Sequence, residues 1–316
     1  MGRRPRPRGP VHDQVLLVDK PAGPTSHDVV ARVRRTAGHT RVGHTGTLDP
    51  PATGVLVVCL GRATKLVRFL QAGTKTYTAR IRLGVATDTQ DATGVELARI
   101  DASHLDEATV CGALRAFQGE IEQIPPMVSA VKVDGQRLHV LARRGETVER
   151  EARRVEVSSL VIDRFVPGSV AEVDVLLTCS AGTYVRTIAH DLGAALGVGG
   201  SLGSLRRVAN GPFAVEECVP LRTIEEIDAA GLQALGIEPL DAVRRTLEVV
   251  EVTDGSVARR LVQGQPLPAL GRAGAVAVVR PQDGARPAQL LAIVEDDPAT
   301  GRARPALVWT RPEDLA

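Results

Sequence analysis

The hydrophobic positions of this chain predict strands of two kinds. Residues 15–18 and 54–60 are continuous apolar runs bounded by turn-forming residues, which predicts two short strands, the second of them buried. Residues 76–83 and 173–179 instead alternate between apolar and polar, which indicates strands with one buried face. The apolar face of the first alternating strand consists of Tyr77, Ala79, Ile81 and Leu83.

Apolar residues at helical spacing predict four helices. The first follows Thr25-Ser-His-Asp28, which has the spacing of a capping box with Asp in the place of the usual Glu. Two others are predicted over 63–70 and 110–117. The fourth begins after the turn at 181–183, and its apolar face consists of Val185, Ile188, Ala189 and Leu192.

Strands and helices alternate along most of the chain, and the one-sided strands favour a largely antiparallel sheet. We therefore predict a mixed α/β domain over residues 11–245, with helices flanking the sheet. The stretch 136–154 carries six Arg and three Glu, which is typical of an exposed excursion. Short apolar runs separated by Gly, Pro and Asp turns predict a separate small β module over residues 248–316. Its expected strands are 275–280, 289–294 and 306–309.

Composition narrows the class of protein. The 316 residues are enough for one large domain or two ordinary ones, and 43% hydrophobic with 24% charged residues excludes wholesale disorder. No apolar run approaches the length of a membrane span. Residues 1–10 are basic without the apolar segment of a signal peptide, so we expect a flexible basic arm. The four cysteines form no CxxC pair, which suits a reducing cytoplasm.

The positive charges are concentrated near the start of the chain. The net charge is only +2, but residues 1–82 contain 12 Arg and 3 Lys against 4 Asp, an excess of +11, and the remainder carries −9. Such a basic first quarter indicates contact with a polyanion such as nucleic acid. A basic patch that only aids solubility is the alternative.

Asp49 is the candidate catalytic residue within this basic region. It precedes Pro50, which holds it in an extended conformation, and the glycines of the loop 38–53 permit close approach of a ligand. Two alternative roles stay open for this residue. The aspartate could cap its own turn, or it could join His39 and His44 in a metal site.

Arg186 is expected to contact Asp49. It lies in the first turn of the fourth predicted helix, where the helix dipole disfavours a cation. A carboxylate partner would offset this cost, and the arginine would lower the pKa of that carboxylate. Solvent exposure of Arg186 is the alternative. Tyr77 and Tyr184 are candidates for stacking on a base, although Tyr77 also fits a core position.

The most specific pattern in the chain consists of five ordered segments. They are LLVDKPAGPTSHD (16–28), GHTGTLDPPATG (43–54), KTYTARIRLGVATDTQDATG (75–94), CSAGTYVRTIAHDLG (179–193) and SLRRVANGPF (204–213). Together they resemble the motifs of the bacterial tRNA pseudouridine synthase B family. Members of that family isomerise uridine 55 in the T-loop of tRNAs, after flipping it into a pocket.

The resemblance implies the pseudouridine synthase fold, with a thumb-like insertion at about 124–154 and a PUA-like RNA-binding barrel at 248–316. It also implies roles for single residues. Asp49 would act on the flipped nucleotide, as a nucleophile at C1′ or as a base at the 2′ carbon. Tyr77 would stack on the uracil and help to remove the C5 proton, and Arg186 would orient Asp49. Substrate contacts are implied for Lys20, His44, Tyr184 and Leu205.

The same resemblance implies a cytoplasmic monomer that acts on the T-arm of tRNA, with no obligate protein partner and no membrane contact. It implies no metal or other cofactor, and the sequence has no GxxxxGK[ST] phosphate loop. Two other classes remain to be tested. One is a non-catalytic tRNA-binding or folding module, and the other is a metal-dependent nuclease or phosphoesterase built on His39, His44 and Asp49.

Overall fold

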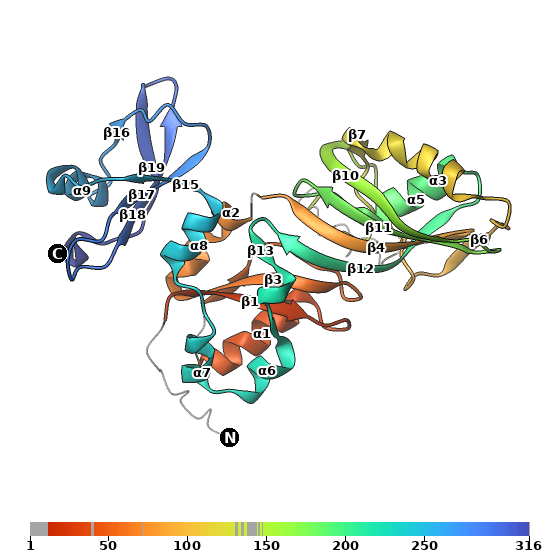
Figure 1. The fold of residues 1–316 in the computed structure, drawn as a ribbon, viewed down its shortest axis with the longest axis horizontal. Helices are drawn as coiled ribbons and strands as arrows, with labels where there is room; N and C mark the ends of the chain where they lie inside the picture. Colours follow the sequence, from red (N-terminus) through yellow and green to blue (C-terminus); the bar gives the residue numbers. More distant parts are fainter. Residues whose placement is uncertain are drawn as a thin grey trace.

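The computed structural model of the chain contains one large and one smaller sheet (Figure 1). It describes residues 12–38, 41–71, 73–129 and 148–315, together with 132–133, 136–137, 144 and 146. The predicted basic arm, His39 and residues 138–143, 145 and 147 of the stretch 136–154 lie outside these residues. Within the described part of the chain, no helix has both the length and the apolar character that crossing a bilayer requires.

A ten-stranded sheet forms the body of the molecule. In chain order its strands are β1 (Gln14–Lys20), β2 (Val42–His44), β3 (Thr53–Leu60), β4 (Lys75–Leu83), β7 (Gly119–Gln123), β10 (Arg153–Val166), β11 (Ala171–Cys179), β12 (Gly200–Asn210), β13 (Phe213–Ala214) and β14 (Val219–Pro220). Their spatial order is β14-β1-β3-β12-β4-β11-β10-β7, with β2 paired to β3 and β13 to β12. Only β1–β14 and β3–β12 pair in parallel, so the predicted mixed fold with a largely antiparallel sheet is confirmed.

Helices flank the two halves of this sheet. In Figure 1, α1, α6 and α7 lie beside the β1–β3 half, whereas α3 and α5 lie over the half formed by β4, β11 and β10. Each group buries its apolar face against its own half of the sheet, and this produces two separate apolar clusters. The helices are α1 (Ser26–Ala37), α2 (Val67–Leu70), α3 (Glu107–Leu114), α5 (Val185–Ala195), α6 (Leu221–Glu226), α7 (Ala229–Ala234), α8 (Pro239–Thr246) and α9 (Gly255–Val262).

Local sequence explains where these helices begin and end. The predicted capping box is present at α1, because the Thr25 side chain accepts from the Asp28 amide and the Asp28 carboxylate accepts from the Thr25 amide. The helix predicted over 63–70 is present, but it is an α-helix only in its last turn. A 3₁₀-helix spans Gly61–Leu66 and leads directly into α2, and the Thr64 hydroxyl donates to the Gly61 carbonyl at 2.7 Å.

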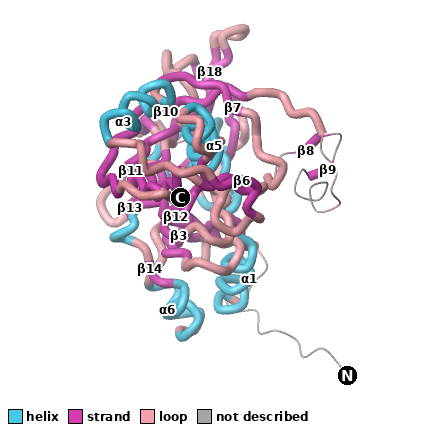
Figure 2. The backbone as a smooth tube through the Cα atoms, turned by 90° about the vertical axis from the view of Figure 1, so that its right-hand side faces the viewer, coloured by secondary structure: helices cyan, strands magenta, loops and turns pink. Residues whose placement is uncertain are grey.

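Two short hairpins lie outside the large sheet. The first pairs β5 (Val85–Thr87) with β6 (Glu96–Arg99), and residues 88–95 connect the two strands. The second pairs β8 (Lys132–Val133) with β9 (Gln136–Arg137). In the view turned by 90°, β8 and β9 stand clear of the large sheet (Figure 2). Their position agrees with an excursion in this part of the chain.

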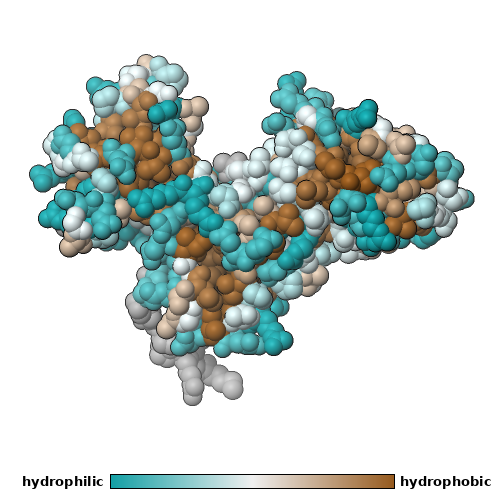
Figure 3. Space-filling view, in the orientation of Figure 1, coloured by the Kyte–Doolittle hydropathy of each residue, from teal (hydrophilic) through white to brown (hydrophobic). Residues whose placement is uncertain are grey.

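The smaller sheet contains the last five strands. These are β15 (Glu248–Glu251), β16 (Leu267–Pro268), β17 (Ala275–Arg280), β18 (Gln289–Asp297) and β19 (Arg302–Val308), in the order β15-β17-β18-β19-β16. The sheet is curled and has α9 beside it, and it forms a separate lobe in the space-filling view (Figures 1 and 3). This arrangement fits the expected PUA-like module.

The C-terminal lobe is nevertheless attached to the body through an apolar interface. One apolar cluster continues from β1 and β3 through α2 and α8 into β17 and β18. The Arg62 guanidinium lies over the Trp309 ring at 4.9 Å and donates to the Trp309 carbonyl. Removal of the lobe would therefore expose part of the core of the body.

Candidate active site

Asp49 lies on a loop between β2 and β3 whose backbone is fixed without the help of its own carboxylate. The Ala52 amide donates to the Asp49 carbonyl at 3.0 Å and closes a turn across the two prolines. Ser26 Oγ accepts from the Leu48 amide at 2.8 Å and donates to the Leu48 carbonyl at 3.0 Å. The Asp49 carboxylate thus remains available for a contact outside the loop.

Lys20, the last residue of β1, supports the same loop. Its side chain is completely buried, and Nζ donates to the carbonyls of Pro21, Asp49, Pro50 and Ala52 at 2.6–3.2 Å. Burial lowers the pKa of the Lys20 ammonium to about 8, against the attraction of Asp49. The sequence predicted a substrate contact here, but Lys20 contacts the loop and does not line the cavity described below.

Arg186 on α5 holds the Asp49 carboxylate, as the helix-dipole argument predicted. Arg186 Nη2 lies 3.0 Å from Asp49 Oδ2, and Nη1 lies 3.8 Å from Oδ2 of a second carboxylate, Asp91. Asp91 is itself fixed, because its Oδ1 accepts from the Thr93 amide and from the hydroxyls of Thr89 and Thr93 at 2.6–2.9 Å. Arg186 therefore links the loop of Asp49 to the loop between β5 and β6.

Electrostatics at Asp49 differ from the sequence-based expectation. We expected Arg186 to lower the pKa of this carboxyl, and the guanidinium does act in that direction. Desolvation is the larger effect, however, and the charge of Asp91 adds to it, so that the pKa of Asp49 is raised above its usual value. The arginine therefore opposes the desolvation, which favours the protonated form of the carboxyl.

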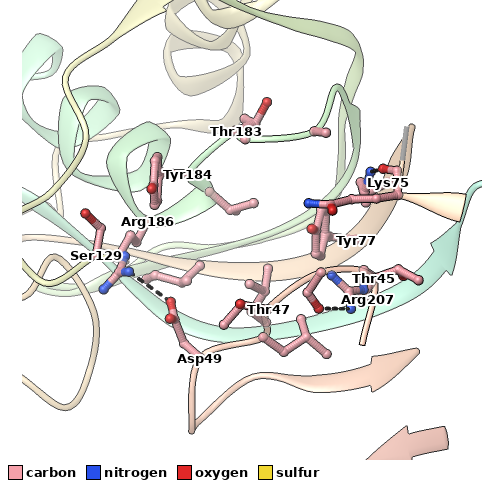
Figure 4. A pocket seen from close by; sticks show the side chains of 18 residues that line it. Thr45, Thr47, Asp49, Lys75, Tyr77, Ser129, Thr183, Tyr184, Arg186 and Arg207 are labelled. Atoms are coloured by element: carbon pink, nitrogen blue, oxygen red, sulfur yellow. Dashed lines mark hydrogen bonds and ion pairs between the residues drawn. The ribbon is translucent and has the colours of Figure 1, made fainter. Parts of the chain in front are cut away.

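Asp49 and Arg186 line a cavity of about 310 Å³ between the Asp49 loop and the start of α5 (Figure 4). In the close-up, Asp49 points toward Arg186, whereas Tyr77 and Lys75 lie toward the other end. The lining comes from separate parts of the chain, which the sheet brings together. Its residues are Thr45–Asp49, Gln71, Lys75, Tyr77, Ser129, Ala181–Arg186, Leu202, Leu205 and Arg207.

Tyr77 and Arg207 form one wall of the cavity. Tyr77 is 8% exposed, and the buried Arg207 lies opposite it on the neighbouring strand β12. Burial raises the pKa of the Tyr77 hydroxyl, and the Arg207 guanidinium acts in the opposite direction. Arg207 itself is held by the carbonyls of Val55 at 2.7 Å and Gly46 at 3.2 Å. Tyr77 is thus both a buried residue and a cavity residue.

Tyr184 and Leu205, two other predicted contacts, line the cavity from different elements. Tyr184 precedes α5, and its amide and carbonyl are both bound by the side chain of the buried Gln123, at 2.9 and 3.2 Å. Its ring lies 5.9 Å from the Arg186 guanidinium. Leu205 of β12 is half-buried and supplies an apolar surface to the cavity.

His44 lies outside the cavity lining, at the end of β2. Its ring meets that of His27 edge to face, with the centroids 5.5 Å apart, and its Nδ1 accepts from the Gly46 amide. Burial and the neighbouring His27 lower the pKa of His44 to about 4, which makes this imidazole neutral near pH 7.

A metal site on the predicted residues receives no support from the geometry. Among the residues that the structure describes, no group of three His, Cys, Asp or Glu side chains is placed to hold a metal ion. Asp49 and Asp91 both face Arg186, and His44 pairs with His27. His39 lies outside the described residues.

Sequence reasoning missed three charged residues of the site. Asp91 lies in the segment 75–94 that carries Tyr77, and Arg207 follows Leu205 by two residues, so both belong to the five ordered segments. Lys75 is 5% exposed and donates to the carbonyl of Gln71 at 2.6 Å. Burial lowers the pKa of Lys75 to about 8. The available signal for Lys75 was its place as the first residue of the segment 75–94, two positions before Tyr77 and in phase with the apolar face of the strand.

Solved structures with a similar fold include complexes that contain Cbf5. The structure titled "Crystal Structure of a Cbf5-Nop10-Gar1 Complex" aligns with a TM-score of 0.71 at 26% identity, and it covers 96% of this chain and 86% of that chain. The structure of the archaeal box H/ACA sRNP Nop10-Cbf5 complex aligns with a TM-score of 0.69 at 24% identity, which supports the fold alone.

Sequence comparison then defines the family. The model for "TruB family pseudouridylate synthase (N terminal domain)" matches residues 34–185, and that for "tRNA pseudouridylate synthase B C-terminal domain" matches 186–249. The tRNA pseudouridine synthase B of Thermobifida fusca is 48% identical and covers 94% of this chain and 98% of its own length. That of Rhodococcus jostii is 43% identical and covers 100% of both. The chain belongs to the TruB family of pseudouridylate synthases.

Proposed function

We propose that this protein is a tRNA pseudouridine synthase that converts uridine 55 of the T-loop to pseudouridine. The observation that carries the proposal is the Asp49–Arg186 ion pair, which opens into a cavity in a chain of the TruB family. Relatives that span nearly the whole chain are named for this activity.

The reaction rearranges one nucleotide and adds or removes no atoms overall. The glycosidic N1–C1′ bond of the flipped uridine breaks, the uracil rotates within the cavity, and C5 bonds to C1′. The proton on C5 is then lost and N1 takes up a proton. Because the base must leave its stack to reach Asp49, a cavity beside that residue is required.

Asp49 is the residue that reacts with the nucleotide. As a nucleophile its carboxylate adds to C1′ and releases the uracil, whereas as a base it takes the proton from the 2′ carbon. Both roles require the ionised form, which desolvation disfavours and Arg186 stabilises at 3.0 Å. Arg186 is therefore needed for the charge of Asp49 as well as for its orientation.

Tyr77 lies on the wall that a flipped uracil would face. Its ring offers a stacking surface, and its hydroxyl, whose pKa the nearby Arg207 guanidinium acts to lower, is a candidate for removal of the C5 proton. Leu205 and Tyr184 supply further surface for the base. His44 is proposed to contact the RNA outside the cavity, where it fills the space that the flipped nucleotides vacate.

The RNA contacts extend beyond the cavity. We assign binding of the T-arm of tRNA to the basic first quarter of the chain, to the region of about 124–154 as a thumb-like insertion, and to the module 248–316. The catalytic body is assigned to residues 11–245. We assign the reaction to a single chain in the cytoplasm, with no obligate protein partner and no cofactor.

The direct test is release of tritium from tRNA transcript labelled with [5-³H]uridine, followed by mapping of the modified position. We expect release equivalent to one uridine per tRNA, at position 55, with the same rate in EDTA. Binding without release would instead support a tRNA-binding or folding module. Cleavage of the tRNA that EDTA abolishes would support the metal-dependent nuclease.

A further inference from the structure

Gln90 has an unusual backbone next to the active site. Among the described residues it is the only non-glycine whose φ lies in the left-handed region, at 65°. This conformation is unfavourable for an L-residue. Such strain persists only where the surroundings fix the residue, and it occurs most often at functional sites. Gln90 directly precedes Asp91, the second carboxylate that faces Arg186.

Backbone hydrogen bonds hold Gln90 in this conformation. Its amide donates to the Thr87 carbonyl at 3.2 Å, and its carbonyl accepts from the Leu202 amide of β12 at 2.9 Å. The next residues continue the contact, because the Ala92 amide donates to the Leu202 carbonyl at 2.8 Å. The loop between β5 and β6 is thus fixed to β12 at Gln90.

The side chain of Gln90 reaches the helix that carries Arg186. Its Oε1 accepts from Thr187 Oγ1 at 3.1 Å, and Thr187 is only 3% exposed. Two consecutive loop residues therefore contact two consecutive helix residues. Gln90 binds Thr187, and Asp91 faces Arg186.

We propose that Gln90 and Thr187 are positioning residues for Arg186, and through it for Asp49. The inference rests on the proposed function. The Asp91–Arg186 separation of 3.8 Å is too long to fix the guanidinium alone, whereas the Gln90–Thr187 hydrogen bond sets the distance between the loop and α5. A small shift of α5 would lengthen the 3.0 Å contact on which the charge of Asp49 depends.

The decisive variant is Gln90→Gly. Glycine adopts the left-handed conformation without strain, so this change removes the side-chain hydrogen bond and keeps the backbone. We expect the single-turnover rate to fall about threefold to tenfold while the melting temperature stays equal or rises. The affinity for tRNA should not change. A residue with a merely structural role would show the opposite result, a lower melting temperature with an unchanged rate.

The pH profile provides a second readout. Asp49 is faced by Arg186 from α5, by Asp91 from the β5–β6 loop and by Lys20 from β1. If Gln90→Gly loosens Arg186, the guanidinium lowers the pKa of Asp49 less than in the wild type. As the pH falls, the rate of the variant should therefore begin to decline at a higher pH. An unchanged acid limb would contradict the proposal.

Partner variants complete the test. Thr187→Val should match Gln90→Gly, Thr187→Ser should retain the wild-type rate, and the double variant should be no slower than either single variant. Thr246→Val removes a comparable hydroxyl contact on α8, to the Ala242 carbonyl at 2.9 Å, and should leave the rate unchanged. Additive losses in the double variant would overturn the pairing.

Amide exchange separates this inference from the proposed function. In Gln90→Gly, the peptide 184–190 should exchange faster than in the wild type, whether or not the protein modifies tRNA. Unchanged exchange would reject the role of Gln90 but not the proposed function. A wild-type protein that releases no tritium would reject the proposed function, and the exchange result would still decide whether Gln90 holds α5.

Discussion

The Arg186 side chain is only 5% exposed, whereas the Asp49 side chain that it contacts at 3.0 Å is 43% exposed. The arginine is therefore the fixed partner, held in α5, and the carboxylate is the group that a substrate can reach. The contact opposes the desolvation that raises the pKa of Asp49. The central feature of the site is a reachable carboxylate in contact with a buried positive charge.

Replacement of Arg186 by lysine tests the geometry of this contact. Lysine keeps the charge but loses the planar group that reaches Asp49 and Asp91 together. We expect Arg186→Lys to lower the single-turnover rate about tenfold to a hundredfold, with a much smaller change in tRNA affinity. A loss confined to affinity would instead identify Arg186 as an RNA contact.

The raised pKa of Asp49 predicts an acid-sensitive rate. The ionised form is the active one, so the rate should rise with pH through the pKa of this group and be lost below it. Because that pKa lies above the ordinary value of 3.8, the decline should begin at a higher pH than for a solvent-exposed aspartate. Single-turnover rates measured between about pH 4.5 and about 8 test this. A flat profile down to the acid end would contradict it.

Asp91→Asn should move this acid limb in a known direction. The substitution removes a negative charge that raises the pKa of Asp49, while the remaining side-chain oxygen can still accept from Thr93. The midpoint of the acid limb is therefore expected at lower pH than in the wild type. A midpoint that stays in place or rises would show that Asp91 acts on Asp49 only through the position of Arg186.

Lys20→Met separates support of the loop from contact with the substrate. Its ammonium donates to four carbonyls, three of them in the Asp49 loop, so its removal leaves buried acceptors without partners. We expect a loss of about 2 kcal/mol in the free energy of unfolding together with a loss of turnover. Urea denaturation checks this, with the exposed Lys65→Met as the matched control. An unchanged stability with weaker tRNA binding would favour the substrate contact.

Those parts of the arrangement that follow from a local residue pattern could be predicted from the sequence. The alternation of 76–83 placed Tyr77 on the buried face, and the position of Arg186 in a first helical turn favoured a carboxylate partner. Both expectations are confirmed by the structure. The catalytic and substrate-binding roles of the site residues remain predictions.

Other parts of the site depend on contacts between distant segments, which no local pattern reveals. The role of Lys20 could not be read from a turn sequence, because three of its four acceptors lie about thirty positions further along the chain. Arg207 is buried because Gly46 and Val55 supply carbonyls from another part of the chain. The 63–70 segment has helical spacing, yet the hydroxyl of Thr64 favours a 3₁₀-helix at its start.

The C-terminal lobe should contribute to binding through charge. Deleting it would expose the apolar cluster that it shares with β1 and β3, so substitutions on its surface are the cleaner test. Arg259 and Arg260 are exposed on α9. We expect Arg259→Ser with Arg260→Ser to weaken tRNA binding at moderate salt and to lower the slope of log Kd against log salt by about 1 to 2. Arg222→Ser on α6 is the control, and an equal effect there would reject a specific role of the lobe.

The most direct measurement compares the wild type with Asp49→Asn in single-turnover release of tritium from [5-³H]uridine-labelled tRNA. Asparagine keeps the size of the side chain and removes its charge, so the fold and the cavity are retained. We expect complete release by the wild type and none by Asp49→Asn, with tRNA affinities that agree within about threefold. Release by Asp49→Asn at the wild-type rate would contradict the assignment of Asp49 as the reacting group.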